Sequence, residues 1–355
     1  LCLLEVRLKQ SLIPLWPMYY WTKHRAKFLI ITLCAVLVYG VSQGERWFTP
    51  LAQPQAHDLN PPKYFGDMVY DVSSNPLTAE GVALGRALFY DPILSLDSTI
   101  SCASCHSSYT AFSHVDHALS HGIGDTIGKR NAPPIQNVGW HKTFRWDGGL
   151  THLDAQVMAP LHNATEMASN LPLVFERLRR SDHYPALFEA AFGDTSISTR
   201  RFIDALVQFQ LILISDNAKY DSVHRGQAKF TAQEKKGFKL FKRNCASCHK
   251  PPLFMNNDFT SNNLPIDSSL MDLGRYHVTQ RPQDSLLFKT PSLRNIEYTF
   301  PYMHDGRFKT IYEVLDHYNS NVMPLSDEEQ TEIYTFLLTL SDYSFIRNPD
   351  FAFPR

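Results

Sequence analysis

The stretch "CASCH" occupies residues 102–106, and the same five letters return at residues 245–249. Each copy has two cysteines three positions apart and a histidine directly after the second cysteine. The pattern C-x-x-C-H is typical of covalent c-type haem attachment, because one helical turn lets both cysteines reach the vinyl groups on one porphyrin edge while the histidine faces the iron. We therefore predict two haem c groups, bound by Cys102, Cys105 and His106 and by Cys245, Cys248 and His249.

Two other interpretations of these cysteines stay open from their spacing alone. The four could share one zinc ion, or each pair could be a redox-active dithiol. A histidine in the fifth position of both copies favours haem, and so does the export segment at the start of the chain, since c-type haems are attached after translocation. The remaining cysteines, Cys2 and Cys34, lie outside the two motifs.

The composition is that of a globular protein of 355 residues, which is long enough for two domains. The formal net charge is only −1. A nearly neutral chain carries none of the excess positive charge that binds polyanions, so we expect no nucleic-acid partner.

The start of the chain has the pattern of an export signal. Met18 is a natural start, so we predict that residues 1–17 are a non-native upstream extension. Basic residues precede the apolar run "FLIITLCAVLVYGV" (28–41), which predicts that residues 18–44 are a signal peptide or an uncleaved membrane anchor. The proline-rich residues 45–63 are a predicted linker. We expect the rest of the chain in the periplasm, either free or tethered to the cytoplasmic membrane.

Each motif follows a stretch with helical spacing, which indicates a duplication. "AEGVALGRALFYDPILS" (79–95) precedes the first copy and "TAQEKKGFKLFKRN" (231–244) precedes the second. The second stretch opens with the capping box of Thr231 and Glu234.

Further helical patterns complete the chain, and strand patterns are scarce. Ser326 and Glu329 form another capping box, and an amphipathic helix at residues 199–214 is predicted to bridge the two halves. We predict a mainly α protein with two cytochrome c-like helical domains, each with one covalently bound haem c. Their predicted limits are residues 64–225 and 226–345, followed by a tail at 346–355.

Several blocks between and after the motifs resemble one known family. They include "RNAP" (130–133), "WDGG" (146–149) and "PYMHDG" (301–306). In these blocks, and over residues 65–345, the chain resembles the bacterial di-haem cytochrome c peroxidases, a family that includes MauG, the maturation enzyme of methylamine dehydrogenase. The resemblance implies an N-terminal peroxidatic haem that reduces hydrogen peroxide to water, and a C-terminal haem that passes electrons to it.

The resemblance also implies the residues around the first haem. His121 matches the family's removable distal ligand, with His114 and His117 as competitors. Glu166 matches the acidic catalyst, whose raised pKa suits it to move a proton between the two peroxide oxygens. Gln156 lines the same pocket, and Trp146 lies between the haems as a conduit for electrons, although an aromatic residue there could also be core.

The second haem departs from the common peroxidase pattern. Where those enzymes have a distal methionine, ungapped counting from His304 places Tyr318, as in MauG. A phenolate ligand favours ferric iron and lowers the potential. The alternatives are that Tyr318 is core and that Met303 or Met323 is the ligand.

A calcium site is the last feature that the resemblance implies. Asn131 matches its side-chain ligand, and Thr299 and Pro301 match its backbone carbonyl ligands. The alternative is that these segments are interdomain packing turns.

Three functions follow from this pattern. In the first, the enzyme reduces peroxide with electrons from a small cytochrome c, a copper protein or quinol. In the second, a MauG-like enzyme uses peroxide to oxidise side chains of a partner protein. In the third, the chain is a passive di-haem electron carrier, which the predicted acidic pocket at Glu166 argues against. The family also includes homodimers.

Overall fold

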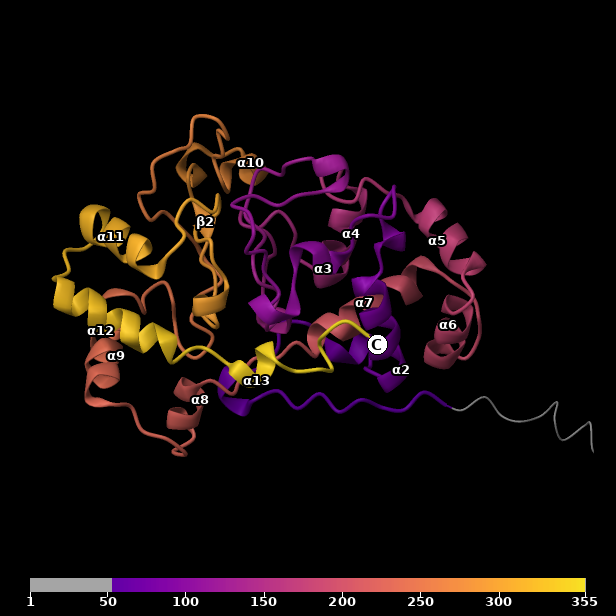
Figure 1. Ribbon diagram of the computed structural model, residues 1–355, viewed down its shortest axis with the longest axis horizontal. Coiled ribbons are helices and arrows are strands. Elements are labelled where there is room, and N and C mark those ends of the chain that lie inside the picture. The colour runs from indigo at the N-terminus through magenta and orange to yellow at the C-terminus, as the bar shows by residue number, and fades with distance from the viewer. Residues whose placement is uncertain (1–52, 355) are drawn as a thin grey trace, which may run out of the picture. The chain divides into compact units, whose positions relative to one another are not determined.

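The computed structural model describes residues 53–354 (Figure 1). The predicted extension 1–17, the export segment 18–44 and the first part of the linker lie outside the described residues. No helix within 53–354 is long and apolar enough to cross a membrane.

The first half of the described chain, residues 53–225, is built from helices and irregular segments. Its α-helices are α2 (Ala79–Tyr90), α3 (Cys102–Cys105), α4 (Leu153–His162), α5 (Leu171–Arg180), α6 (Tyr184–Phe192), α7 (Thr199–Leu211) and α8 (Lys219–His224). Short 3-10 helices lie at Lys63–Phe65, Val72–Ser74, Pro92–Leu94, Ser108–Thr110, Ile123–Asp125 and Val138–Trp140.

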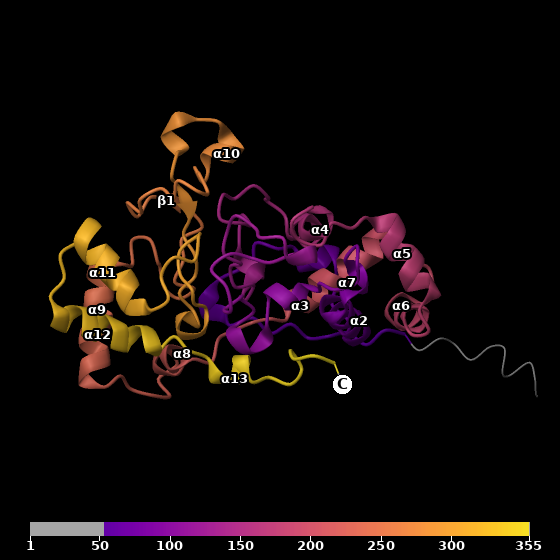
Figure 2. The same ribbon diagram turned by 45° about the horizontal axis from the view of Figure 1, so that its top comes forward.

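The second half, residues 226–354, is also mainly helical. Its α-helices are α9 (Ala232–Asn244), α10 (Tyr276–Thr279), α11 (Ile311–Asn321), α12 (Asp327–Leu338) and α13 (Tyr343–Ile346). Two short strands, β1 (Phe259–Thr260) and β2 (Phe288–Lys289), pair antiparallel, and 3-10 helices lie at Pro282–Asp284 and Ile296–Tyr298. The segment around α10 projects from the rest of this half (Figure 2).

The capping residues explain where the helices begin. Thr231 Oγ1 accepts a hydrogen bond from Glu234 N at the start of α9, and Ser326 Oγ accepts one from Glu329 N at the start of α12. In both boxes the glutamate carboxylate accepts from the backbone N–H of the capping residue. Each cap satisfies N–H groups that the first helical turn leaves free, and such caps contribute about 1 kcal/mol. The two predicted capping boxes are therefore confirmed.

The two halves repeat one packing arrangement. In each, the helix that precedes the haem motif crosses a later helix at a glycine. A Cβ on Gly85 of α2 would lie 1.9 Å from Ala205 O of α7, and a Cβ on Gly237 of α9 would lie 1.9 Å from Glu332 O of α12. Only glycine allows this close approach, so the repeat supports the duplication inferred from the motifs.

Two hydrophobic clusters lie on either side of the middle of the chain. One contains α2, α6 and α7, and the other contains Tyr220 and residues of α9, α11 and α12. Helix α7 was expected to bridge the halves, but its side chains Phe202, Leu206 and Phe209 are buried in the first cluster. It belongs to the core of the first half, so that part of the prediction is wrong.

The end of the chain returns to the first half. Phe345 and Phe351 belong to the first hydrophobic cluster. The C-terminal segment lies near α2 (Figure 1). The hydroxyl of Tyr90 in α2 donates to Phe351 O at 2.6 Å, and Arg86 donates to Ala352 O at 2.7 Å. The segment predicted as a tail is therefore an integral part of the packing.

A buried ion pair joins the halves. The side chains of Arg294 and Asp221 are both fully buried, with N–O distances of 2.7 and 2.9 Å. Arg294 also donates to Ser215 O and Pro252 O. These contacts satisfy a guanidinium that would otherwise be very costly to bury.

Candidate active site

The first haem motif forms a single helical turn that presents both cysteines. Ser101 caps α3, and its backbone N–H donates to Ser104 Oγ at 3.1 Å. His106 follows the turn, and its Nδ1 lies 2.8 Å from Phe112 O. Because a carbonyl can only accept, Nδ1 carries the hydrogen and Nε2 is left free as a metal ligand. Burial lowers the pKa of His106 to about 4, which keeps the ring neutral, as a ligand must be.

The second motif repeats this geometry at the end of α9. His249 N donates to Cys245 O at 2.8 Å, which closes the turn. His249 Nδ1 lies 3.1 Å from Pro291 O and 3.3 Å from Phe254 O, so its Nε2 is free as well. Burial again lowers the pKa, to about 4. Both predicted proximal histidines are therefore held in the tautomer that binds iron.

The cysteines are arranged as predicted for haem and not for zinc. The four motif cysteines are free of disulfides. Burial raises the pKa of Cys102 to about 12 and that of Cys105 to about 11, the opposite of what a reactive dithiol needs. Within residues 53–354 no three His, Cys, Asp or Glu side chains gather closely enough to hold a metal ion, so the four cysteines do not form one zinc site.

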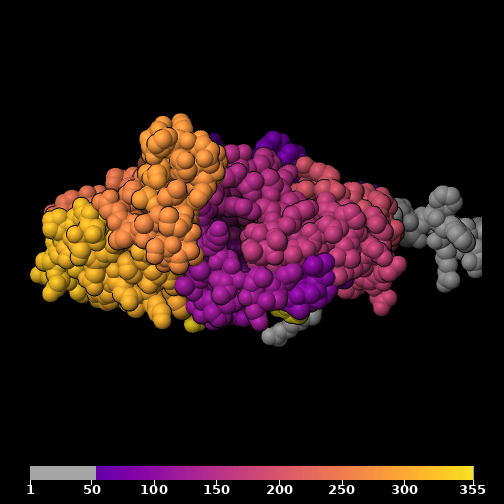
Figure 3. All heavy atoms as spheres, turned by 90° about the horizontal axis from the view of Figure 1, so that it is seen from above, coloured from indigo at the N-terminus to yellow at the C-terminus, as the bar shows by residue number. Residues whose placement is uncertain are grey.

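A cavity of about 600 Å³ adjoins the first motif. Figure 3 looks onto the face where the surface is hollowed, among first-half residues and beside the projecting segment of the second half. The cavity brings together all of the residues predicted around the first haem: Cys102, Cys105, His106, His121, Trp146, Gln156 and Glu166. Gln156 Oε1 is buried there without a hydrogen-bond partner, so a polar acceptor is available to a group that fills the cavity. The site therefore fits a haem.

Glu166 combines burial with one strong hydrogen bond. Asn163 Nδ2 donates to Glu166 Oε1 at 2.6 Å. Burial raises the pKa of Glu166, and this outweighs the opposing effects of Arg145 and of the Asn163 hydrogen bond. A carboxyl group with a raised pKa in such a cavity is suited to accept and return a proton.

A tight loop fixes His121 beside Glu166. Ile123 N donates to Glu166 O at 2.9 Å, and Thr126 Oγ1 donates to Thr165 O at 3.2 Å. A Cβ on Gly122 would lie 2.2 Å from Thr165 O, so the residue after His121 must be glycine for the two segments to come this close.

The three candidate distal histidines cluster, but they are not equivalent. The His117 ring stacks on His121 at 4.1 Å between centroids, and the His114 ring lies 5.5 Å from His117. Of the three, only His121 lines the cavity, and its carbonyl oxygen lies 3.4 Å from Cys105 Sγ. The geometry therefore favours His121 over its competitors.

Trp146 connects the two halves through its backbone. Its indole Nε1–H donates to Asn131 O at 2.9 Å, and Lys289 N of β2 donates to Trp146 O at 2.8 Å. Asn131 N in turn donates to His304 O at 2.7 Å. This brings the predicted calcium ligand Asn131 to the turn that follows Pro301, although no hydrogen bond within residues 53–354 joins Asn131 to Thr299 or Pro301.

The candidates for the sixth ligand of the second haem meet around Asn262. Burial raises the pKa of Tyr318 to about 12, with smaller effects from hydrogen bonding to Asn262 and from the nearby Cys245 and Cys248. Tyr318 is therefore close enough to Cys245 and Cys248 for their charges to affect its pKa. Asn262 Nδ2 also lies 3.3 Å from Met303 Sδ, and Met323 N donates to Tyr318 O at 2.8 Å.

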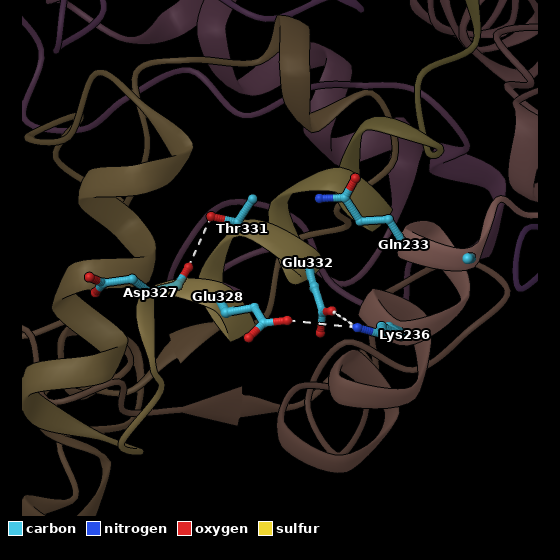
Figure 4. A pocket seen from close by; sticks show the side chains of 7 residues that line it. Gln233, Lys236, Asp327, Glu328, Thr331 and Glu332 are labelled. Atoms are coloured by element: carbon cyan, nitrogen blue, oxygen red, sulfur yellow. Dashed lines mark hydrogen bonds and ion pairs between the residues drawn. The ribbon is translucent and has the colours of Figure 1, made fainter.

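A second, open pocket of about 540 Å³ lies between α9 and α12. Its side chains pair with one another: Lys236 Nζ lies 3.0 Å from Glu332 and 3.7 Å from Glu328 (Figure 4). None of the predicted site residues lines this pocket, so it is not part of the candidate site.

Sequence reasoning missed several residues of the cavity. Lys289 and His141 line it together, and Asn163 binds Glu166. The letters "FKTP" (288–291) and "NATEM" (163–167) lie within residues 65–345, over which the chain resembles the family. The sequence did not indicate the roles of these side chains, because those roles depend on contacts between distant segments.

The comparisons with known proteins agree with this geometry. A family model described as "Di-haem cytochrome c peroxidase" matches residues 79–229. The methylamine utilization protein MauG of Methylorubrum extorquens is 36% identical over 286 residues, which cover 75% of this chain and 80% of that protein. The cytochrome c peroxidase Ccp of Escherichia coli is 36% identical over 248 residues, 66% of this chain and 52% of the relative. The crystal structure of a MauG-like protein associated with microbial copper homeostasis matches with a TM-score of 0.78 and 31% identity, over 84% of this chain and 99% of that chain.

Proposed function

Since the chain belongs to the family of di-haem cytochrome c peroxidases, we propose that it is an oxidoreductase that reduces hydrogen peroxide to water in the cavity of the first motif. The observation that carries this proposal is that the first haem motif, His121, Gln156 and Glu166 line one cavity. Haem c would supply the iron that binds peroxide and the electrons that reduce it. The protein's part is to place a proton carrier, to hold a removable ligand and to join the two haem sites.

Glu166 is the proposed proton carrier. Cleavage of the peroxide O–O bond needs a proton moved from the inner to the outer oxygen, and a carboxylate with a raised pKa can take and return that proton. Asn163 holds Glu166 Oε1 at 2.6 Å, which leaves Oε2 for this exchange. Gln156 offers its unpartnered Oε1 to the same space.

His106 and His249 are the proposed proximal ligands, and His121 is the proposed distal ligand that leaves before peroxide binds. The loop that carries His121 is bonded to the backbone of Glu166, so the position of the distal ligand and that of the acid are linked. Trp146 is the proposed path for electrons, because it contacts residues of both halves.

For the second haem we propose Tyr318 as the sixth ligand, in preference to Met303 or Met323. The electrostatic effect of Cys245 and Cys248 on the pKa of Tyr318 supports this choice. We also propose the finer architecture that the sequence predicted: cytochrome c-like domains at 64–225 and 226–345, each with one haem c, exported to the periplasm by residues 18–44. The haem motif in each half and the two largest hydrophobic clusters support the two domains.

Calcium between the halves remains a proposal with Asn131, Thr299 and Pro301 as ligands. Two hydrogen bonds of Asn131 support this proposal. Asn131 N donates to His304 O, three residues after Pro301, and Asn131 Nδ2 donates to Ala118 O. That arrangement leaves Oδ1 as the oxygen for a cation.

A second candidate function is oxidation of side chains in a partner protein. Tyr318 at the position of the MauG tyrosine and the 36% identity with MauG favour it. The test is turnover of hydrogen peroxide by the haem-loaded protein with reduced cytochrome c, a reduced copper protein or a quinol as donor. Turnover with any of these supports peroxide reduction, and failure with all three rejects it in favour of the partner-protein function.

A further inference from the structure

The side chain of Lys289 lies in the interior without a negative partner. The residue is only 8% exposed. No carboxylate within residues 53–354 comes within 4 Å of its Nζ. An isolated cation in such a place is costly, and burial alone lowers its pKa to about 7. A buried, unpaired ammonium therefore calls for an anion.

Within residues 53–354, Lys289 Nζ makes one polar contact, and this contact bears on which nitrogen of the neighbouring histidine carries the hydrogen. Nζ lies 3.0 Å from His141 Nδ1. When Lys289 is protonated, its ammonium group can only donate, so Nδ1 accepts and the imidazole hydrogen is on Nε2. His141 Nε2 is buried and has no partner in the described structure. The pair thus presents an unsatisfied N–H donor with a positive charge directly behind it.

This pair faces the haem cavity. Both His141 and Lys289 line the same space as the first haem motif, and so does Pro291, whose carbonyl oxygen lies 3.1 Å from His249 Nδ1. Lys289 N also donates to Trp146 O. The charged pair is therefore held rigidly on the side of the cavity that leads toward the second motif.

We propose that Lys289 and His141 bind a propionate carboxylate of one of the two haems. In haem c the vinyl groups are consumed by the cysteines, and the two propionates remain as the anions that enter the site with the cofactor. A carboxylate would satisfy the His141 N–H and the Lys289 ammonium together. The inference rests on the haems of the family and is independent of the reaction with peroxide.

Lys289→Met in the haem-loaded protein tests the proposal. Loss of the cation leaves the propionate unpaired, which favours the oxidised haem. We expect the reduction potential of one haem to fall by about 59 mV or more, a tenfold change in the ratio of reduced to oxidised haem for a one-electron couple. The propionate bending band in resonance Raman spectra should shift with it. The proposal would be overturned if the haem reduction potentials and the propionate band of Lys289→Met both match those of the parent protein.

Lys142→Met is the matched control, because it removes the same charge from an exposed lysine beside His141. It should change neither readout, since water screens that charge. Lys289→Arg should keep the parent potential.

If Lys289→Met fails to take up haem, His141→Phe provides the second test. It removes the N–H donor and must shift the propionate band, and an unchanged band would equally reject the site. None of these readouts needs peroxide, so they are separable from a failure of the proposed peroxidase activity.

Discussion

At the scale of single residues, Glu166 shows most clearly how the site is tuned. Its pKa is raised because burial disfavours the charged carboxylate more than Arg145 and Asn163 favour it. A group with this shift suits proton transfer, but the ionised form weakens the fold. Burial of Glu166 therefore favours proton transfer but lowers the stability of the folded protein.

We predict that Glu166→Gln stabilises the haem-loaded protein at neutral pH. A raised folded-state pKa means that the folded protein holds its proton more tightly than the unfolded chain does. The contribution of Glu166 to stability is then fully present below its unfolded pKa and is lost as the pH rises through the higher folded value. Denaturant unfolding of both proteins at pH 7 and at pH 4 would check this. The gain should be present at pH 7 and shrink at pH 4, and a gain of the same size at both pH values would refute burial of the ionised carboxylate as its cause.

The prediction for the second haem concerns Tyr318 as its sixth ligand. Tyr318→Phe should change the absorption spectrum of the oxidised second haem and raise its reduction potential, because a hard oxygen ligand that stabilises ferric iron is lost. Met303→Leu and Met323→Leu are the matched controls and should leave the spectrum unchanged. A spectral change in either methionine variant, together with none in Tyr318→Phe, would move the ligand to that methionine.

At the scale of elements, the loop of residues 120–127 determines where His121 lies. Its position depends on backbone contact with the segment that ends at Glu166, which only Gly122 permits. No pattern in the sequence marks this contact, because it joins segments that are about forty positions apart. The haem motifs and the capping boxes at Thr231 and Ser326 were predictable, since each is complete within a few consecutive residues.

Gly122→Ala should displace the proposed distal ligand His121 while leaving the His121 side chain itself unchanged. The new Cβ would lie 2.2 Å from Thr165 O, so the loop must move, at a cost of about 1–3 kcal/mol in unfolding free energy. We expect this movement to displace His121, so that the first haem binds peroxide faster than in the parent protein. Gly124→Ala is the control in the same loop: its Cβ meets nothing within 4 Å, although its positive φ also costs about 1 kcal/mol. An unchanged rate of peroxide binding in Gly122→Ala would show that the loop does not hold His121 in place.

At the scale of the whole molecule, the contacts between distant segments were the least predictable part. The sequence indicated a helical duplication with one haem motif in each half. It did not indicate that α7 belongs to the first core, that Phe351 returns to α2, or that Lys289 and His141 share a cavity. These features depend on tertiary packing between segments far apart in the chain, which local periodicity does not encode.

The free energy of unfolding should depend strongly on the buried ion pair of Arg294 and Asp221, which joins the two halves. Arg294→Met leaves Asp221 buried without its partner and should cost about 3–5 kcal/mol in the unfolding free energy of the haem-loaded protein. Arg180→Met breaks a pair with Glu176 in which both side chains are exposed, and it should cost about 1 kcal/mol or less. Chemical denaturation compares the two directly. Equal costs would mean that the buried pair does not stabilise the joint.

The central claim is that peroxide is reduced in the cavity of the first motif, with Glu166 as proton carrier. The most direct measurement is the kcat for hydrogen peroxide of Glu166→Gln in the haem-loaded protein, with Glu176→Gln at an exposed position of α5 as control. We predict a loss of about 10²–10⁴-fold for Glu166→Gln, with both haems still attached, and no loss for the control. Turnover by Glu166→Gln at the parent rate would contradict the account.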